Sequence, residues 1–195
     1  MIIGLTGGMG CGKSTAARLF EEHGFSRLDS DDLIRTRILV DPEVIAAAAH
    51  HFGPTVLDAE GRIDRSALAR AVFSDEERLR LWEEEIHPRL YALWRREIDA
   101  APAGTPWLIE VPLLYEKELE KWFDLVVCVT TTSPRQFARL QERGISRALA
   151  EARISKQLPL AKKIELADFV LSNDGSLRFL RDQITHLVAR LDLNR

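Results

Sequence analysis

Residues 7–14 read GGMGCGKS and match the complete phosphate-loop pattern G-x-x-x-x-G-K-S/T. The glycines allow successive backbone N–H groups to point inward and form a concave anion-binding nest. Lys13 is placed to reach the β- and γ-phosphates of a nucleoside triphosphate, and the hydroxyl of Ser14 to ligate Mg²⁺. The motif therefore predicts a triphosphate site with Mg²⁺, and it leaves open which acceptor takes the γ-phosphoryl group.

Three acidic residues are candidates for the remaining chemistry. Asp29 and Asp31 lie in the segment LDSDD, where a short apolar run gives way to a helical pattern. A carboxylate there can accept a hydroxyl proton or hold Mg²⁺ through water. The alternative is helix capping, for which Asp is a favoured residue. Glu110 ends the apolar segment WLIE, where an acid can support the water shell of the metal.

A basic segment follows in the second half of the chain. Residues 130–165 hold eight Lys or Arg and three Asp or Glu side chains. Arginine predominates and recurs about every four residues, at Arg139, Arg143, Arg147 and Arg153. Several of these side chains can share one helix face and clamp phosphate oxygens. A solvated helix face is the alternative interpretation.

The segment His87-Pro88-Arg89 interrupts a long helical pattern. Proline disfavours the α conformation at the preceding residue, so we expect a bend at His87. Arg89 lies just beyond and is a candidate contact for an anionic substrate. The five histidines show no metal-ligand spacing.

Short apolar runs alternate with helical patterns in the way that is typical of a parallel α/β sheet covered on both faces. Strands are expected at residues 1–6, 25–29, 107–111, 125–129 and 169–171. The first strand leads into the phosphate loop, and a helix over residues 13–23 follows it. A last helix over residues 177–191 has core-packing spacing.

Residues 30–100 are too long for a simple crossover between strands. Helical patterns cover residues 31–39, 42–52, 65–73 and 75–100. The insertion follows the carboxyl end of the second strand, where open α/β sheets bind ligands. A second helical excursion covers residues 134–163 and carries the basic excess, so we expect it to close over the triphosphate as a lid.

Composition limits the remaining possibilities. The chain has 195 residues, 46% of them hydrophobic, which fits one α/β domain with insertions. A net charge of −3 argues against a general nucleic-acid binder. No apolar run approaches the length of a membrane span, and no secretory signal is recognised, so we expect a cytoplasmic protein. Cys11 and Cys128 are not expected to form a disulfide, and Cys11 is either a reactive thiol or a small loop residue.

Several of these motifs together resemble the dephospho-coenzyme A kinase family over nearly the whole chain. The opening segment IGLTGGMGCGKST carries the resemblance at residues 3–15. The later markers are Asp29-Ser30-Asp31, His87-Pro88-Arg89, VPLLYE at residues 111–116, Arg143, Arg153, Gln157, Ala167-Asp168 and Asn173-Asp174-Gly175. The phosphate loop is shared by very many NTPases, whereas the segments PLLYE and HPR are far more specific.

The resemblance implies a three-layer P-loop NTPase fold with a five-stranded parallel sheet, a helical substrate-binding insertion and a helical lid. The core would comprise residues 1–29, 101–133 and 164–195. Residues 30–100 would bind coenzyme A, and residues 134–163 would form the lid. The implied reaction transfers the γ-phosphoryl group of ATP to the ribose 3′-hydroxyl of dephospho-CoA, with Mg²⁺ and with no nucleic-acid or membrane partner.

The resemblance also implies roles for individual residues. Asp31 matches the base, and Arg139 and Arg143 match lid arginines that act in catalysis together with Lys13. The ATP-binding residues would be Gly8, Gly10, Cys11, Gly12, Lys13, Ser14, Thr15 and, near adenine, Asn173. The substrate-binding residues would be His87, Arg89, Pro112, Leu113 and Glu116. Mg²⁺ would be held by Ser14, with Asp29 or Glu110 acting through water.

Three alternatives compete with this interpretation. A nucleoside or nucleotide kinase would share the loop and the arginine lid and would differ in the insertion. A regulatory GTPase would need a guanine-reading N-K-x-D or T-K-x-D motif, which the sequence lacks. A nonenzymatic nucleotide-binding module would not be expected to retain Lys13, Ser14, Asp31 and the arginines together.

Overall fold

The computed structural model describes residues 1–192, which form two compact units. The first, here called the sheet unit, consists of Met1–Leu28 and the chain from Ala103 onward. The second, called the helical unit, is the continuous segment Asp29–Pro102. The helical unit therefore interrupts the sheet unit in sequence.

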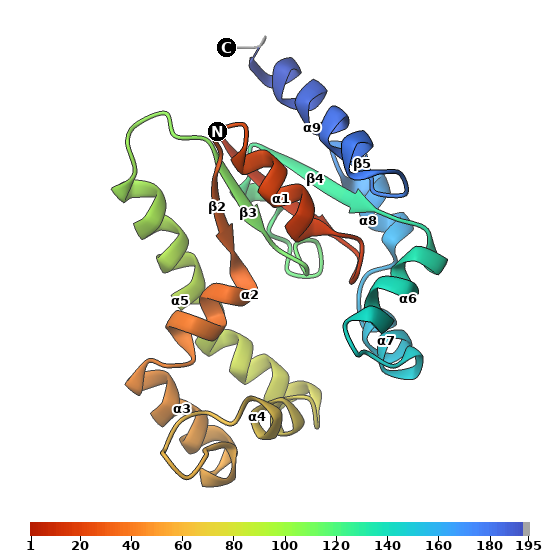
Figure 1. Ribbon diagram of the computed structural model, residues 1–195. Coiled ribbons are helices and arrows are strands. Elements are labelled where there is room, and N and C mark those ends of the chain that lie inside the picture. The colour runs from red at the N-terminus through yellow and green to blue at the C-terminus, as the bar shows by residue number, and fades with distance from the viewer. Residues whose placement is uncertain (193–195) are drawn as a thin grey trace. The chain divides into compact units, whose positions relative to one another are not determined.

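Five parallel strands form the centre of the sheet unit (Figure 1). They are β1 (Ile2–Gly7), β2 (Ser26–Asp29), β3 (Trp107–Glu110), β4 (Leu125–Thr130) and β5 (Phe169–Ser172). Their spatial order is β2-β3-β1-β4-β5, so β1 lies in the middle. Leu5 pairs with Glu110 of β3, and Gly7 pairs with Val129 of β4. The five predicted strands are confirmed, with ends shifted by one residue.

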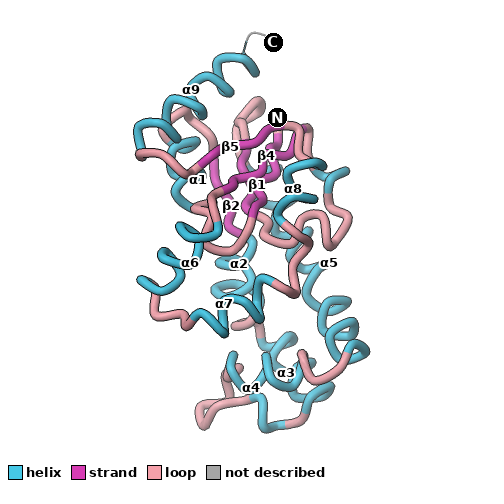
Figure 2. The backbone as a smooth tube through the Cα atoms, turned by 90° about the vertical axis from the view of Figure 1, so that its right-hand side faces the viewer, coloured by secondary structure: helices cyan, strands magenta, loops and turns pink. Residues whose placement is uncertain are grey.

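Helices cover both faces of the sheet, which confirms the three-layer fold. Helices α1 (Lys13–Glu21) and α9 (Leu177–Asp192) contact each other on one face. Helix α8 (Leu160–Leu166) contacts β1 and β4. Figure 2 shows α1 and α9 on one side of the strands and α8 on the other.

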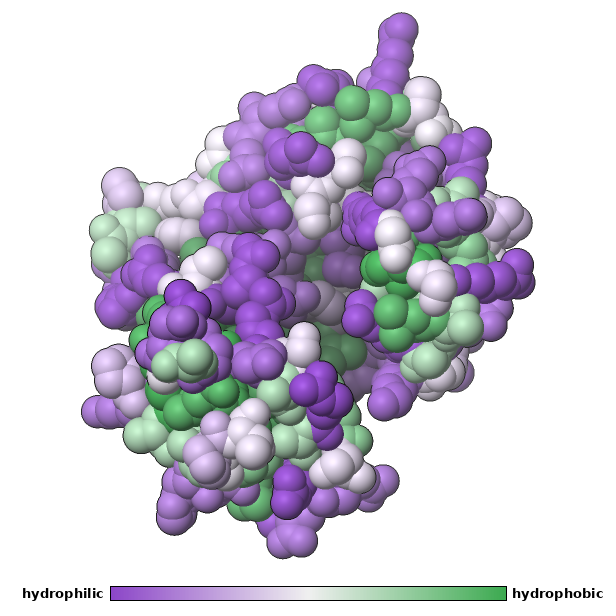
Figure 3. Space-filling view, turned by 60° about the horizontal axis from the view of Figure 1, so that its bottom comes forward, coloured by the Kyte–Doolittle hydropathy of each residue, from purple (hydrophilic) through white to green (hydrophobic). Residues whose placement is uncertain are grey.

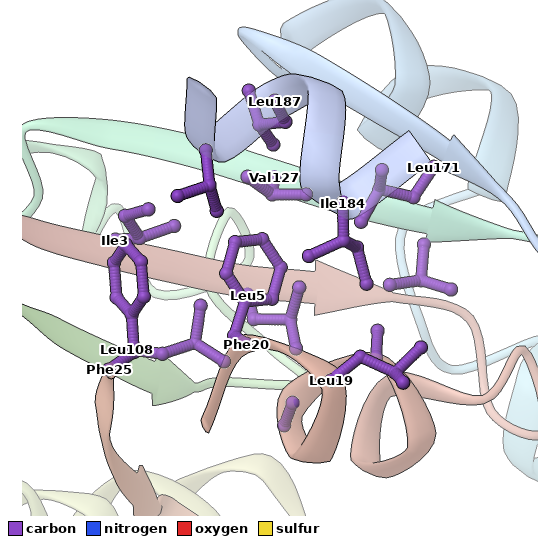
Figure 4. Close-up of a cluster of buried hydrophobic side chains, with 14 of the residues drawn as sticks. Ile3, Leu5, Leu19, Phe20, Phe25, Leu108, Val127, Leu171, Ile184 and Leu187 are labelled. Carbon is purple, nitrogen blue, oxygen red and sulfur yellow. The ribbon is translucent and has the colours of Figure 1, made fainter. Parts of the chain in front are cut away.

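The core between β1, α1 and α9 fixes the strand end from which the phosphate loop starts (Figure 4). Ile3 and Leu5 alternate along β1 and are fully buried in this core. Phe20 packs edge-to-face on Phe25, with ring centroids 5.3 Å apart. Complete burial of an apolar side chain of this size contributes about 1.5–3 kcal/mol.

The basic excursion after β4 forms three helices. These are α6 (Ser133–Glu142), α7 (Arg147–Ile154) and α8. Gly144, with φ 75°, follows α6, and the hydroxyl of Ser146 accepts from the N–H of Leu149 to cap α7. A short 3-10 turn, η3 (Glu120–Trp122), precedes β4.

The helical unit contains α2 (Ser30–Leu33), η1 (Ile34–Ile38), α3 (Pro42–Phe52), η2 (Pro54–Val56), α4 (Arg65–Val72) and α5 (Glu76–Ala100). Aspartate caps begin four of the helices, because Asp29, Asp41, Asp64 and Asp75 each accept a backbone N–H of the first turn. The predicted helix over residues 31–39 is divided into α2 and the π-helical turn η1. Helix α5 continues through Pro88, so this proline does not end it.

The helical unit has its own apolar core. Phe52 of α3 packs on Trp82 of α5 with ring centroids 5.6 Å apart, and Leu68 and Val72 of α4 join the same cluster. The face drawn in Figure 3 carries hydrophilic residues around separate hydrophobic patches. Within residues 1–192, no helix is both long and apolar enough to cross a membrane.

Candidate active site

The phosphate loop leaves β1 at Gly7 and ends at Gly12, where α1 begins. Gly12 is left-handed, with φ 96° and ψ 31°, and a Cβ atom there would lie 2.1 Å from Nδ2 of Asn173. Both the conformation and the close contact require glycine at this position. No side chain caps α1, so the N–H groups and the positive dipole of its first turn serve the loop.

Lys13 lies across the loop in this structure. Its ammonium group donates to the carbonyl oxygens of Gly7 and Gly8, each at 3.1 Å. The N–H groups of Gly10 and Gly12 have no hydrogen-bond acceptor within residues 1–192. A cation beside backbone donors that lack an acceptor is the arrangement that binds phosphate oxygens.

Ser14 and Glu110 lie together at the start of α1 and the end of β3. The hydroxyl of Ser14 donates to Oε2 of Glu110 at 3.3 Å. Only 3% of Glu110 is exposed, and Nε of Arg27 donates to its Oε1 at 2.6 Å. The Arg27 guanidinium compensates the buried carboxylate. A hydroxyl and a carboxylate are oxygen donors of the kind that Mg²⁺ prefers, so these two residues fit a magnesium ion.

Three side chains contact the outer side of the phosphate loop. Gln136 of α6 donates to the carbonyl of Met9 at 2.5 Å, and Arg139 of α6 donates to the carbonyl of Cys11 at 3.3 Å. Asn173, which follows β5, also donates to the Cys11 carbonyl, at 2.8 Å. The structure thus brings Arg139 and Asn173 to the loop, from positions far away in the sequence.

Gln136 is a site residue that the sequence reasoning missed. It carries no charge, so neither the charge count nor the arginine spacing marks it. The available signal is its position three residues before Arg139, on the same face of a helix. A polar residue on the buried face of a helix needs a partner, and here the partner is the loop.

Asp174 holds together the segment that carries Asn173. Its carboxylate accepts from the N–H of Thr132 at 2.7 Å and from the hydroxyl of Thr131 at 2.9 Å. The backbone hydrogen bond from Thr132 is the main cause that lowers the pKa of Asp174. This link joins the start of α6 to the turn after β5, the two elements that contact the phosphate loop.

The other basic side chains behave differently from Arg139. Arg147 pairs with Glu151 at 2.9 Å and lies over the ring of Phe137. Arg143 and Arg153 are exposed and make no ion pair with any described residue. The four arginines, several of which were expected to share a face, therefore lie in three different environments.

Cys11 is fully buried in the loop. Burial is the main cause that raises the pKa of its thiol, although Lys13 acts in the opposite direction. The thiol is therefore protonated near neutral pH, which favours the interpretation of Cys11 as a small loop residue over a reactive thiol.

The segment after β3 is held by contacts with Lys163 and Leu158. The carbonyl of Pro112 accepts from the ammonium group of Lys163 at 2.7 Å. The same ammonium group lies 2.8 Å from Oε1 of Glu116, which also accepts from the N–H of Leu158 at 2.8 Å. The side chain of Leu113 in this segment is 38% exposed.

Asp29 and Asp31, the two candidate acids after β2, lie in different environments. Asp29 caps α2, because its carboxylate accepts from the N–H of Asp32 at 3.1 Å. Asp31 lies in the first turn of α2 and is exposed.

His87 and Arg89 line two different pockets of the helical unit, each of about 250 Å³. Arg89 donates to Glu85 at 2.9 Å and to Glu43 at 3.2 Å. Burial acts to lower the pKa of Arg89, and these two hydrogen bonds outweigh it and raise the pKa. The ring of His87 stacks on Tyr91, with centroids 5.9 Å apart.

Comparison with known proteins agrees with these features. The model of the dephospho-CoA kinase family matches residues 1–178. The dephospho-CoA kinase of Gloeobacter violaceus is 39% identical over 184 residues, which are 94% of this chain and 89% of that protein. The solved structure of TT1252 from Thermus thermophilus is 36% identical, with a TM-score of 0.87, and covers 98% of this chain and 97% of its own.

A more distant structure shares the fold. The dephospho-CoA kinase from Campylobacter jejuni is 24% identical, with a TM-score of 0.71, and covers 97% of this chain and 96% of its own. The fold, the phosphate loop and the extent of the family match lead to one conclusion: this chain belongs to the dephospho-CoA kinase family.

Proposed function

We propose that the sheet unit holds ATP on its phosphate loop and that the helical unit holds dephospho-CoA. The reaction is that of the family, the ATP-dependent phosphorylation of dephospho-CoA in coenzyme A biosynthesis. The observation that carries the proposal is the family match over residues 1–178, which include the complete phosphate loop. It favours dephospho-CoA over the acceptors of a nucleoside or nucleotide kinase.

The donor site is proposed from the loop geometry. The N–H groups of Gly10 and Gly12 would bind phosphate oxygens, and Lys13 would exchange its two carbonyl partners for the β- and γ-phosphates. Gly8, Cys11, Ser14 and Thr15 complete this loop.

The metal is proposed to be Mg²⁺, held by Ser14 and, through water, by Glu110. When bound with ATP, Mg²⁺ neutralises charge that develops on the transferring group. The adjacency of the Ser14 hydroxyl and the Glu110 carboxylate supports this choice. Asp29, the other candidate, is occupied as the cap of α2.

Asp31 is proposed as the base. The 3′-hydroxyl oxygen forms a bond to the γ-phosphorus, the bond from that phosphorus to the β–γ bridging oxygen breaks, and the hydroxyl proton passes to the Asp31 carboxylate. Its exposure and its position directly after β2 support this role, because a base must be open to the acceptor.

The lid is proposed within residues 134–163, where Arg143 is the candidate cation for the γ-phosphate. Arg143 is exposed and makes no ion pair with a described residue, so a phosphate would not have to displace a carboxylate. Helix α8 packs on β1 and β4, and α6 is hydrogen-bonded to the phosphate loop through Gln136 and Arg139. We therefore place the moving part between these two helices, in residues 143–154.

Contacts to the acceptor are proposed in each unit by itself, in residues 30–100 of the helical unit and in the segment after β3 of the sheet unit. Arg89 and His87 would contact dephospho-CoA from the helical unit, and Pro112 and Leu113 would border the reacting ribose. Glu116 would act by holding this segment through Lys163. A cytoplasmic location and the absence of a nucleic-acid partner remain predictions from the charge and composition of the chain.

The test is coupled ADP release with dephospho-CoA, adenosine monophosphate or pantothenate offered separately. We expect release with dephospho-CoA alone, and mass spectrometry should find the product heavier by one phosphoryl group. The matched control is the Lys13→Ala variant with dephospho-CoA. Faster release with adenosine monophosphate than with dephospho-CoA would contradict the proposed acceptor.

A further inference from the structure

Two carbonyl groups of the phosphate loop are held from outside the loop. The Met9 carbonyl accepts from Nε2 of Gln136 at 2.5 Å. The Cys11 carbonyl accepts from Nδ2 of Asn173 at 2.8 Å and from the guanidinium group of Arg139 at 3.3 Å. All three donors come from elements that follow β4, more than 120 residues later in the chain.

The geometry of the peptide group links these carbonyl contacts to the direction of the neighbouring N–H groups in the anion-binding nest. A trans peptide is planar, and its C=O and N–H bonds point in opposite directions. No peptide bond in residues 1–192 is cis. A Met9 carbonyl held outward therefore directs the N–H of Gly10 inward, and a Cys11 carbonyl held outward does the same for the N–H of Gly12. Neither of these two donors has an acceptor in the described chain.

The three side chains are built into the protein. Gln136 and Asn173 are each only 7% exposed. The backbone carbonyl of Asn173 accepts from the guanidinium group of Arg139 at 2.9 Å and from the hydroxyl of Thr131 at 3.3 Å. The backbone N–H of Asn173 donates to the carbonyl of Thr130 at 2.8 Å. Buried polar groups with this many partners have one preferred orientation, because any other would leave a donor or an acceptor unsatisfied.

We propose that Gln136, Arg139 and Asn173 are positioning residues that hold the phosphate loop open for the β-phosphate. Arg139 acts through the Cys11 carbonyl and Asn173, and it does not contact the γ-phosphate. Asn173 acts on Gly12 and the Cys11 carbonyl, and it does not contact adenine. The inference rests on the proposed binding of ATP to this loop, and it needs no acceptor.

ADP distinguishes the two roles of Arg139. The nest binds the β-phosphate, which ADP and ATP share, whereas an arginine on the γ-phosphate affects ATP alone. The experiment measures Kd for ADP and for a nonhydrolysable ATP analogue by calorimetry in the variants Gln136→Glu, Asn173→Asp and Arg139→Gln. We expect both Kd values to rise together, roughly 5–100-fold, which is the range for a buried hydrogen bond replaced by an unsatisfied group.

Two variants, one on α6 and one at its C-cap, serve as controls. Gln141→Glu makes the same chemical change at an exposed position of α6 and should leave both Kd values within about twofold, since a solvated charge there contributes little. Arg143→Gln should leave the Kd for ADP unchanged while turnover falls. An unchanged Kd for ADP in Arg139→Gln, together with weaker binding of the ATP analogue, would place Arg139 on the γ-phosphate and overturn the proposal.

Folding is checked by thermal melting and by calorimetric binding of dephospho-CoA. Gln136→Met, which removes the donor without adding charge, replaces Gln136→Glu if that variant does not fold, and the same rise in both Kd values is expected. A folded Gln136→Met variant with parental Kd for ADP overturns the inference for Gln136. Failure of the proposed function appears separately, as no turnover of dephospho-CoA by the unmodified chain that still binds ADP.

Discussion

The ammonium group of Lys163 lies 2.8 Å from the carboxylate of Glu116, and the Lys163 side chain is completely buried. This pair joins α8 to the segment after β3, and the same ammonium group donates to the carbonyl of Pro112. It fixes the segment that we propose beside the reacting ribose. The resemblance implies a contact between Glu116 and the substrate. In this structure Oε1 of Glu116 meets Lys163 and the N–H of Leu158, while its buried Oε2 has no hydrogen-bond partner among the described residues.

Replacing Lys163 should therefore destabilise the protein. We expect Lys163→Met to lower the free energy of unfolding by about 3–5 kcal/mol, because it leaves a largely buried carboxylate without its cation. Denaturant unfolding measures the change. The double variant Lys163→Met with Glu116→Gln should recover part of the loss, since the amide oxygen still accepts from Leu158 and no charge is buried. A loss below about 1 kcal/mol in the single variant, the level of an exposed pair, would show that the pair contributes little.

Lys13→Ala should nearly abolish phosphoryl transfer and leave the fold intact. A preorganised charge on the transferring group contributes about 3–4 kcal/mol, or 10²–10³ in rate. Steady-state turnover with dephospho-CoA measures the effect, and circular dichroism checks the fold. Lys162→Ala is the control, because Lys162 is exposed and pairs with Glu165. A folded Lys13→Ala variant that turns over within about threefold of the parent contradicts the role of Lys13.

Asp31→Asn should lower turnover by roughly 10²–10⁴-fold, the usual contribution of a general base, with a small effect on ATP affinity. Asp29→Asn should have little effect, because asparagine caps a helix about as well as aspartate. Rapid-quench measurement of the chemical step separates the two variants. The reverse result, with Asp29→Asn crippled and Asp31→Asn nearly silent, would mean that the base is Asp29.

Arg89→Ala should raise the KM for dephospho-CoA about tenfold and leave the KM for ATP nearly unchanged, because a charge-assisted hydrogen bond to the anionic acceptor is lost. Initial rates with each substrate varied in turn measure the split. Arg80→Ala removes an exposed ion pair with Glu84 on the same helix and is the matched control. A rise confined to ATP would move Arg89 to the donor site.

Residues 143–154, which include α7, should become better protected from hydrogen exchange when a nonhydrolysable ATP analogue binds. Arg143 and Arg153 are exposed and make no ion pair with a described residue, and ATP supplies an anion. Mass-spectrometric exchange with and without the analogue measures the change, with α9 as the internal reference. Unchanged protection of residues 143–154 at saturating analogue would argue against a lid.

Local sequence patterns were sufficient to predict the strands and most helices and to identify the phosphate loop. Residues that lie next to one another in the sequence predict the five strands, the loop GGMGCGKS and helix α3. Alternation and helical spacing report burial within one element, and glycine and proline report backbone conformation. The same information indicated the acids after β2, of which Asp29 proved to be the cap of α2.

Tertiary structure alone decided the partners of the polar side chains. Arg139 and Arg143 look alike in the sequence, yet one reaches the loop carbonyl of Cys11 and the other remains exposed. Gln136 gave no chemical signal, and Lys163 looked like one more cation of a basic segment, although it is buried against Glu116. Sequence periodicity places a side chain on a face of its own helix, but which group it meets depends on the packing of segments that lie far apart in the chain.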